Sequence, residues 1–363
     1  MLPHTPDPDR QIVYFPYWRY RGIRFSCIDT DIQHQFLDIT HPAVDLPFFP
    51  ASMGLRAQAM RLSFVSSVAA GRFLKPVLSM EEMLARLENR FESESPRGRL
   101  YHHAHVGDVF SLIYAPFYVG TRLVDAVLNR SVSGPLPDAF CDQLPVSDLS
   151  ERQLRFLSAL CPTCGWNLSG KRNAVILTCT NCNSAWQPIG SSLKPVPVGF
   201  LPDDEADLFL PYWRIAADVS GVSLSSYADL VRLANLPRVV QKGWEDMPFY
   251  FWSLGFRLSP KAFLTQSVYI NLTQPQEKPV PGNPKGSLYP VTLPVTEAVD
   301  ALKISLAGMV KPVETRFPQL PQIHIKPLRF SLVYVPFRSG HHEWLQPKFS
   351  MAINKNLLSL TDH

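Results

Sequence analysis

The sequence FSLIYAPFYVG at residues 110–120 recurs as FSLVYVPFRSG at residues 330–340, with seven of the eleven positions identical and no gap. Each copy is a short apolar run that favours a β-strand. Its proline must lie at a strand end or a sheet edge, because proline has no amide hydrogen to donate to a neighbouring strand. A chain that contains the same strand twice indicates an internal duplication.

Shorter motifs in the same order support this interpretation. PYWR occurs at residues 16–19 and again at 211–214, and SMGLR at residues 52–56 is matched by SLGFR at residues 253–257. A third and weaker match follows, in which KPVLSMEEMLARLE at residues 75–88 resembles YPVTLPVTEAVDALK at residues 289–303. Four matches in one order predict a tandem repeat with a unit of about 150 residues.

Each unit is expected to mix strands and helices, which makes the fold class α+β. PYWR follows an apolar run and is predicted to end a strand. Ser79 and Glu82 have the spacing of a capping box, and Ser259 followed by Pro260 has the composition of a helix start. The predicted fold is therefore two tandem copies of a mixed strand and helix unit.

The segment between the copies contains two CxxC pairs separated by 14 residues. Each CxxC turn presents two thiolates from one small knuckle, and a tetrahedral Zn²⁺ site needs four. The segment resembles a zinc ribbon over residues 161–182, with a hairpin turning near Gly170. The resemblance implies four ligands: Cys161, Cys164, Cys179 and Cys182.

A structural Zn²⁺ is favoured over a catalytic one, because four thiolates leave no open coordination position. Rubredoxin-like iron fits the same spacing, and disulfide exchange is the least favoured alternative. Free thiolates point to a reducing compartment, so we expect a cytoplasmic protein.

The expected domain boundaries follow from these motifs. The first α+β unit spans residues 1–148, and a helix together with the zinc ribbon that follows it spans residues 149–190. A proline-rich linker at residues 191–206 precedes the second unit at residues 207–363.

The composition limits the classes of function. The 363 residues carry a net charge of +4, with 46% hydrophobic and 18% charged residues, a balance typical of a globular protein. We expect no signal peptide, because the N-terminal sequence lacks the basic start and apolar core. No apolar run approaches the roughly 18 residues that a transmembrane helix requires, so we expect no transmembrane segment.

No dinucleotide-binding, phosphate-loop or nucleophile-elbow motif occurs. HHEWLQ at residues 341–346 opens like a metalloprotease helix motif, but Gln346 stands where the second histidine is needed. His103 and His105 also lack an identifiable third ligand, so we interpret these histidines as surface or edge-strand residues.

Tryptophan and arginine residues that occur in both copies are candidate binding residues. A guanidinium beside an indole suits a carboxylate or a phosphate, which would give two related anion sites. The favoured interpretation is structural, with each tryptophan filling a core and each arginine stem covering it. The candidates are Trp18, Arg19, Arg56, Trp213, Arg214 and Arg257.

Three hypotheses for function remain. The leading one is a zinc-stabilised scaffold or adaptor subunit that binds other proteins through Phe117, Tyr118 and Phe337. The second is a nucleic-acid-associated protein whose ribbon meets phosphates through Lys171 and Arg172. The third is an enzyme with a pocket between the two units, because such a pocket needs no linear motif.

Overall fold

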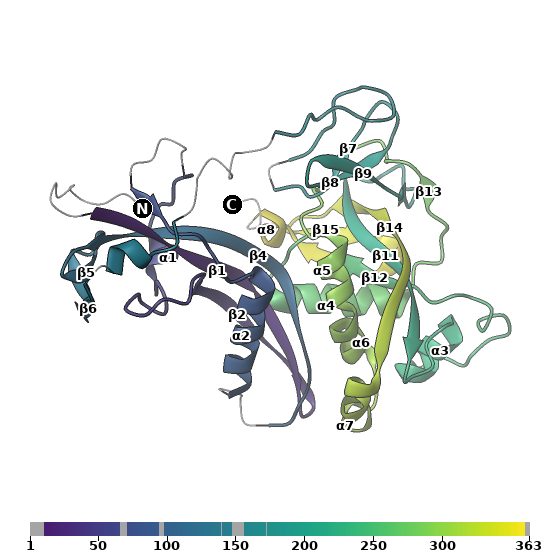
Figure 1. The fold of residues 1–363 in the computed structure, drawn as a ribbon. Coiled ribbons are helices and arrows are strands. Elements are labelled where there is room, and N and C mark those ends of the chain that lie inside the picture. The colour runs from purple at the N-terminus through teal and green to yellow at the C-terminus, as the bar shows by residue number, and fades with distance from the viewer. Residues whose placement is uncertain are drawn as a thin grey trace. The chain divides into compact units, whose positions relative to one another are not determined.

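The computed structural model describes residues 11–65, 71–93, 98–138, 140–146, 156–171 and 173–359. It contains both strands and helices, which confirms the α+β class (Figure 1). The chain forms two compact units. Unit 1 contains Met1–Gly22, Phe36–Arg97 and Asp108–Arg155, and unit 2 contains Ile23–Gln35, Gly98–Gly107 and Phe156–His363.

The strands of unit 1 belong to a six-stranded sheet with the order β2-β1-β4-β5-β6, in which β3 pairs with β1. The strands are β1 (Gln11–Ile28), β2 (Asp31–Pro42), β3 (Arg72–Phe73), β4 (Leu100–Val119), β5 (Arg122–Asp125) and β6 (Arg130–Pro135). The helices are α1 (Arg56–Ala59), α2 (Met80–Ser93) and the 3-10 turn η1 (Phe140–Gln143). The predicted capping box of α2 is confirmed, because Glu82 accepts from the Ser79 amide and Ser79 Oγ accepts from the Glu82 amide.

Unit 2 contains a seven-stranded sheet with the order β12-β11-β14-β10-β13, extended by the β15 and β16 hairpin. The strands are β10 (Val198–Phe200), β11 (Leu208–Ser220), β12 (Phe251–Leu254), β13 (Val280–Pro281), β14 (His324–Ser339), β15 (Glu343–Gln346) and β16 (Met351–Asn354). The α-helices are α3 (Tyr227–Leu233), α4 (Pro260–Thr273), α5 (Val295–Asp300), α6 (Leu302–Met309), α7 (Val313–Arg316) and α8 (Lys355–Ser359). The 3-10 turns are η3 (Phe317–Gln322) and η4 (Pro347–Phe349). None of the described helices is long and apolar enough to cross a membrane.

A separate three-stranded sheet, β7-β8-β9, lies in the cysteine-containing part of unit 2. Its strands are β7 (Leu177–Thr178), β8 (Ala185–Ile189) and β9 (Ser192–Val196). The segment predicted as a linker at residues 191–206 therefore contains strands β9 and β10, and β10 pairs in parallel with β14. Proline removed individual amide donors here without preventing strand pairing. The helix predicted to begin at residue 149 is partly outside the described residues, and residues 156–159 are not helical.

The unit boundary differs from the one predicted from sequence because three strands cross it. It falls after Gly22 in β1, after Gln35 in β2 and after Gly107 in β4. Beyond it, Phe25 and Cys27 join the apolar core that contains α4 and α6. The Phe25 and Phe263 ring centroids lie 6.0 Å apart. Burial of these side chains places residues 23–35 and 98–107 in unit 2.

Backbone hydrogen bonds fix the repeated PYWR motif of unit 1. The Ala43 amide, just after β2, donates to the Pro16 carbonyl at 2.9 Å. The amides of Val77 and Leu78 both donate to the Ala43 carbonyl, at 2.8 and 2.9 Å. The Trp18 indole then donates to the Leu78 carbonyl at 2.9 Å. These four hydrogen bonds together join three segments of the unit.

Unit 2 contains the same hydrogen-bond pattern around its own PYWR. The Gly255 amide donates to the Pro211 carbonyl at 2.9 Å, and the amides of Thr292 and Leu293 donate to the Gly255 carbonyl at 2.9 and 3.0 Å. The Trp213 indole donates to the Leu293 carbonyl at 2.9 Å. Gly255 therefore makes the same hydrogen bonds in unit 2 that Ala43 makes in unit 1.

This pattern corrects one sequence match. SMGLR and SLGFR were aligned through Gly54 and Gly255, but these glycines occupy different places. Gly54 lies in a turn with a φ of +57° before α1, whereas Gly255 follows β12 and packs directly against Pro211. The short motif recurred because glycine suits both a left-handed turn and a close backbone approach.

The two indole hydrogen bonds predict unequal losses of stability. Trp213→Phe leaves the Leu293 carbonyl without this donor inside a core where Trp213 is 0% exposed, so we expect a loss of about 1–3 kcal/mol. Trp18→Phe should cost less, since Trp18 is half-buried. Urea denaturation measures both, and Trp166→Phe, at a side chain 57% exposed, is the control. Equal stability of all three variants would contradict this account.

Amide side chains cover the edge strand β12 on the side away from β11. Asn271 accepts from the Trp252 amide at 2.9 Å and donates to the Trp252 carbonyl at 2.6 Å. Gln274 makes the same pair of contacts with Tyr250, at 3.3 and 2.7 Å. Two side chains at the end of α4 thus take the place of a neighbouring strand, which protects the edge from pairing with another chain.

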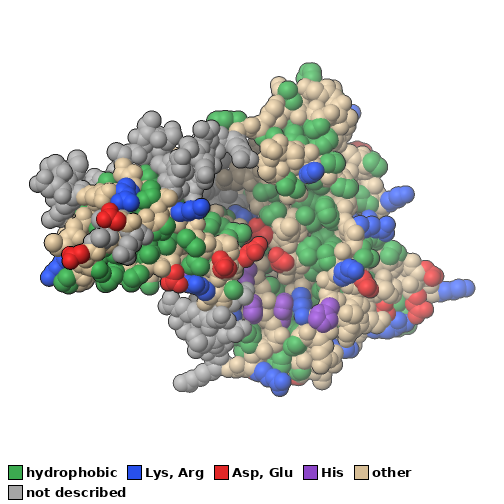
Figure 2. All heavy atoms as spheres, viewed as in Figure 1, with side chains coloured by type: hydrophobic (Ala, Val, Ile, Leu, Met, Phe, Trp, Pro, Cys, Tyr) green, Lys and Arg blue, Asp and Glu red, His purple; other side chains and the backbone are tan. Residues whose placement is uncertain are grey.

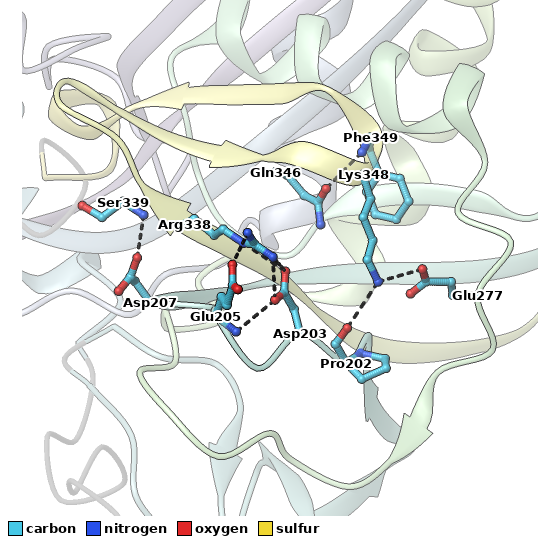
Figure 3. A network of polar contacts seen from close by, with 10 residues as sticks. All are labelled: Pro202, Asp203, Glu205, Asp207, Glu277, Arg338, Ser339, Gln346, Lys348 and Phe349. Atoms are coloured by element: carbon cyan, nitrogen blue, oxygen red, sulfur yellow. Dashed lines mark hydrogen bonds and ion pairs between the residues drawn. The ribbon is translucent and has the colours of Figure 1, made fainter.

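A polar network fixes the loop between β10 and β11 to the end of β14 (Figure 3). Arg338 donates to both carboxylate oxygens of Asp203, at 3.0 and 3.1 Å, and also pairs with Glu205. Burial opposes ionisation of Asp203, but the Glu205 amide and the Arg338 guanidinium lower its pKa. Ser339 donates its amide to Asp207 at 2.7 Å. This network holds the segment that leads out of the cysteine-containing part.

Candidate metal centre

The four cysteines predicted as ligands are brought together by the fold. Their sulfur atoms all lie within 4.8 Å of one another. They belong to what we term the cysteine module, residues 160–196, which contains β7, β8 and β9. Cys161 and Cys179 are buried, whereas Cys164 is exposed and Cys182 is half-buried. Four sulfurs at this separation can share a single metal ion.

Each CxxC pair is shaped by a tight turn. In the first knuckle the Cys161 amide donates to the Trp166 carbonyl at 2.7 Å, and the Gly165 amide donates to the Cys161 carbonyl at 2.8 Å. Gly165 has a φ of +72°, a conformation that glycine adopts without steric cost. The glycine directly after the second cysteine therefore helps to form this turn.

The second knuckle repeats this geometry. The Cys179 amide donates to the Ser184 carbonyl at 2.8 Å, and Asn183 adopts a φ of +56° at the position that Gly165 has in the first knuckle. Asparagine is one of the few other residues that tolerate this conformation. Both turns thus present their thiols from the same local structure, one in each half of the module.

Hydrogen-bond donors surround the sulfurs. Burial opposes ionisation of Cys161, but the Ser184 hydroxyl and the amides of Cys164 and Thr163 lower its pKa to about 6. Burial raises the pKa of Cys179 to about 11. A metal ion would offset this cost, because its positive charge stabilises a coordinated thiolate.

Ser184 is a supporting residue that the spacing of the cysteines did not predict. Its hydroxyl lies 3.0 Å from the Cys182 sulfur and 3.5 Å from the Cys161 sulfur. It also accepts from the Trp186 indole at 2.8 Å. This buried tryptophan orients the serine, and the serine in turn contacts two of the candidate ligands.

The donor set fits a closed metal site. Thiolates select zinc or iron over hard cations, and four of them complete a tetrahedron without a position for water or substrate. Among the described residues this is the only group of three or more metal-ligating side chains. The histidines discussed above do not form a second one.

Those histidines differ in environment. His341 and His342 are exposed, as expected. His103 and His105 are half-buried on β4, and burial lowers the pKa of His105 to about 4. His105 is therefore neutral near pH 7 in the folded chain.

Three of the four candidate arginines form ion pairs within their own units. Arg19 pairs with Asp38 on β2, at 2.7 and 2.6 Å, and Arg56 pairs with the buried Asp125. Arg257 lies 3.7 Å from Glu297. These ion pairs are structural contacts within each unit. Arg214 differs, because it stacks on an aromatic ring.

The expectation of an exposed aromatic surface at the repeated strands is wrong. Phe117 and Phe337 are 0% exposed and Tyr118 is 6% exposed. They lie near the ends of β4 and β14, and the side chains of Phe117 and Phe337 pack into the apolar cores of unit 1 and unit 2. The prolines before Phe117 and Phe337 predicted a strand end or a sheet edge, but Pro116 and Pro336 lie within β4 and β14, which are inner strands of their sheets.

The exposed apolar side chains lie elsewhere, and several lie at the cysteine module. Within the module Trp166 is 57% exposed, Ile189 51% and Leu160 49%, and Phe156, just before the module, is 94% exposed. Hydrophobic side chains are visible on the lobe that carries β7, β8 and β9 (Figure 2). A tryptophan directly after a CxxCG turn was the available signal, because that short turn has little interior in which to bury an indole.

No known protein family matches the chain, and searches of curated proteins and of solved structures also find no match.

Proposed function

We propose that the cysteine module is a zinc ribbon in which Cys161, Cys164, Cys179 and Cys182 hold one structural Zn²⁺. The two knuckles with the same turn geometry support this, as does the absence of any further coordination position. Iron in a rubredoxin-like tetrathiolate site is the alternative that the same donor set would accept. Free thiolates of this kind persist in a reducing compartment, and we propose the cytoplasm.

We propose further that the chain is a zinc-stabilised scaffold or adaptor subunit that assembles with other proteins. The observation that carries this proposal is the exposed apolar surface of the cysteine module, centred on Trp166 and Leu160. Tryptophan is enriched among the residues that dominate binding energy at protein interfaces. A closed metal site beside it would provide rigidity, and a rigid anchor loses little entropy on binding.

A pull-down from the native host tests this function. Trp166→Ser is expected to lose the partner proteins that the wild-type chain retains, because the anchor side chain is removed from the interface. Val239→Ser is the matched control, since Val239 is 86% exposed in unit 2 outside the module. Partners retained by Trp166→Ser, or lost equally from both variants, would contradict the proposal.

A nucleic-acid partner is the second candidate, and the charge of the module supports it. Residues 156–202 contain no aspartate or glutamate, whereas Lys171, Arg172 and Lys194 are basic. Arg172 lies outside the described residues. The same pull-down tests this candidate. It is favoured if nucleic acid co-purifies with the wild type, is lost from Lys171→Gln, and is released steeply by salt, because salt dependence is the sign of counterion release. The scaffold is favoured if Trp166→Ser loses protein partners and their binding does not show this salt dependence.

We infer that units 1 and 2 are copies of one ancestral unit. The matched motifs PYWR and FSLxYxPF support this inference, as do the equivalent hydrogen bonds of Trp18 and Trp213. Both motifs lie on adjacent strands in each sheet, β1 and β4 in one and β11 and β14 in the other. The duplication gives the proposed scaffold two related α+β bodies, of which unit 2 contains the cysteine module.

A further inference from the structure

Unit 2 contains an arginine whose counterpart in unit 1 is neutralised. Asp38 lies five residues before Ala43, and Tyr250 lies five residues before Gly255, the residue equivalent to Ala43. In unit 1 the carboxylate of Asp38 receives two hydrogen bonds from Arg19. In unit 2 the corresponding Arg214 places its guanidinium carbon 3.5 Å from the Tyr250 ring centroid. The tyrosine has taken the place of the carboxylate.

A second arginine lies on the same face of the sheet. Strand pairing sets Ala216 of β11 opposite Arg329 of β14, and Arg214 opposite Ser331. Side chains two residues apart on a strand share a face, and cross-strand partners lie beside one another. Arg214, Arg329 and Ser331 therefore lie around Ala216 on this face.

The charges of Arg214 and Arg329 are not neutralised by an acidic side chain in the described residues. No aspartate or glutamate in the described part of the chain forms an ion pair with Arg214 or Arg329. Burial lowers the pKa of Arg214, Tyr250 offsets part of that shift, and the charge of Arg329 lowers the pKa by a smaller amount. Two guanidiniums held near each other without an acidic partner repel, and a bound anion would remove that repulsion.

Contacts with neighbouring side chains hold Arg214 in position. Its guanidinium lies over Tyr250, and Gln274 binds both the amide and the carbonyl of Tyr250. The edge contacts of α4 therefore hold the ring on which the arginine rests. Stacking restricts the guanidinium to a plane, so less entropy is lost when it binds a ligand.

We propose that Arg214, Arg329 and Ser331 form a phosphate-binding site on this face of unit 2. The forked guanidinium group of one arginine satisfies a carboxylate, as Arg19 and Asp38 illustrate. Two forks and a hydroxyl supply more donors than a carboxylate needs, and they suit the greater charge and the additional oxygens of a phosphate group. The phosphate belongs either to a free small molecule or to the backbone of a nucleic acid.

Calorimetric titration of the full chain with inorganic phosphate, in a buffer without other oxyanions, tests the site. Saturable binding is expected, and Arg329→Gln should weaken it at least tenfold, because one charged fork is lost from an exposed position that does not contribute to the core. Arg214→Lys should weaken it as strongly, since lysine keeps the charge but loses the planar fork. Lys261→Gln, at an exposed lysine of α4, should leave it unchanged.

A fluorescent single-stranded oligonucleotide provides the second arm. If Arg329→Gln and Arg214→Lys weaken oligonucleotide binding and the free anion binds poorly, the phosphate of a strand is the ligand. If the free anion binds well and the oligonucleotide does not, a small phosphorylated molecule is the ligand. The proposal is overturned if the wild type binds neither probe saturably, or if Lys261→Gln weakens binding as much as the two arginine variants. Neither result depends on the scaffold function, which is tested separately at Trp166.

Discussion

Replacing Cys179 by serine is expected to abolish binding of one equivalent of metal and to unfold the cysteine module. Cys179 is 0% exposed, and serine would leave three thiolates around a buried hydroxyl. Structural zinc contributes about 10–16 kcal/mol of apparent binding free energy at neutral pH, and that energy stabilises folding. The short strands β7 and β8 contain too few apolar contacts to replace it. This is the largest single effect that we expect.

Elemental analysis of the purified chain measures the metal content, and limited proteolysis measures the loss of order in the module. Cys27→Ala is the matched control, because Cys27 is a buried thiol in unit 2 outside the four-sulfur group. It should keep the metal despite its lost packing. A wild-type chain without zinc or iron, or a Cys179→Ser chain that keeps a full equivalent, would disprove the proposed site.

Replacing Asn271 by leucine is expected to have the second largest effect. Asn271 is 0% exposed, and its amide nitrogen also donates to the Ser267 carbonyl at 2.7 Å. Leucine fills a similar volume but makes none of the three hydrogen bonds, so the amide and carbonyl of Trp252 lose their partners in a buried place. Each unpaired buried group costs about 1–3 kcal/mol, so we expect the free energy of unfolding to fall by about 3–5 kcal/mol.

Chemical denaturation followed by circular dichroism measures this loss. Thr273→Ala serves as the control on the same helix, because the Thr273 hydroxyl is exposed and bonds only to a helix carbonyl. Asn271→Asp separates the two roles of the side chain, since a carboxylate still accepts from the Trp252 amide but cannot donate to its carbonyl. A loss below about 1 kcal/mol for Asn271→Leu would show that the edge of β12 does not depend on this cap.

The sequence predicted features whose cause lies within a few residues. The spacing of Cys161 and Cys164 predicted a knuckle, and the knuckle is closed by hydrogen bonds that span six residues. The capping box at Ser79 and Glu82 was found for the same reason. Both repeated tryptophans donate an indole hydrogen bond to a backbone carbonyl of their own unit, and an indole that recurs with its flanking strand is more often a packing residue than a ligand.

Other features depended on segments far apart in the chain. The segment predicted as a linker pairs with β8 and β14, and no local signal identified those partners. Gly54 and Gly255 looked equivalent within five residues but differ in their hydrogen bonds. Exposure was the least predictable property, because it depends on which distant segments cover a strand end.

The sequence by itself determined the four candidate ligands of the cysteine module and the mixed α+β composition, since turn chemistry and apolar periodicity act over one turn or one strand. Tertiary structure alone decided that Phe117 and Phe337 are buried. It also decided that Asn271 covers a sheet edge and that Arg214 lies beside Arg329. The register between β11 and β14 brings together residues more than 100 positions apart. Register follows from the packing of the whole sheet, in which a shift of one residue would move every side chain to the opposite face.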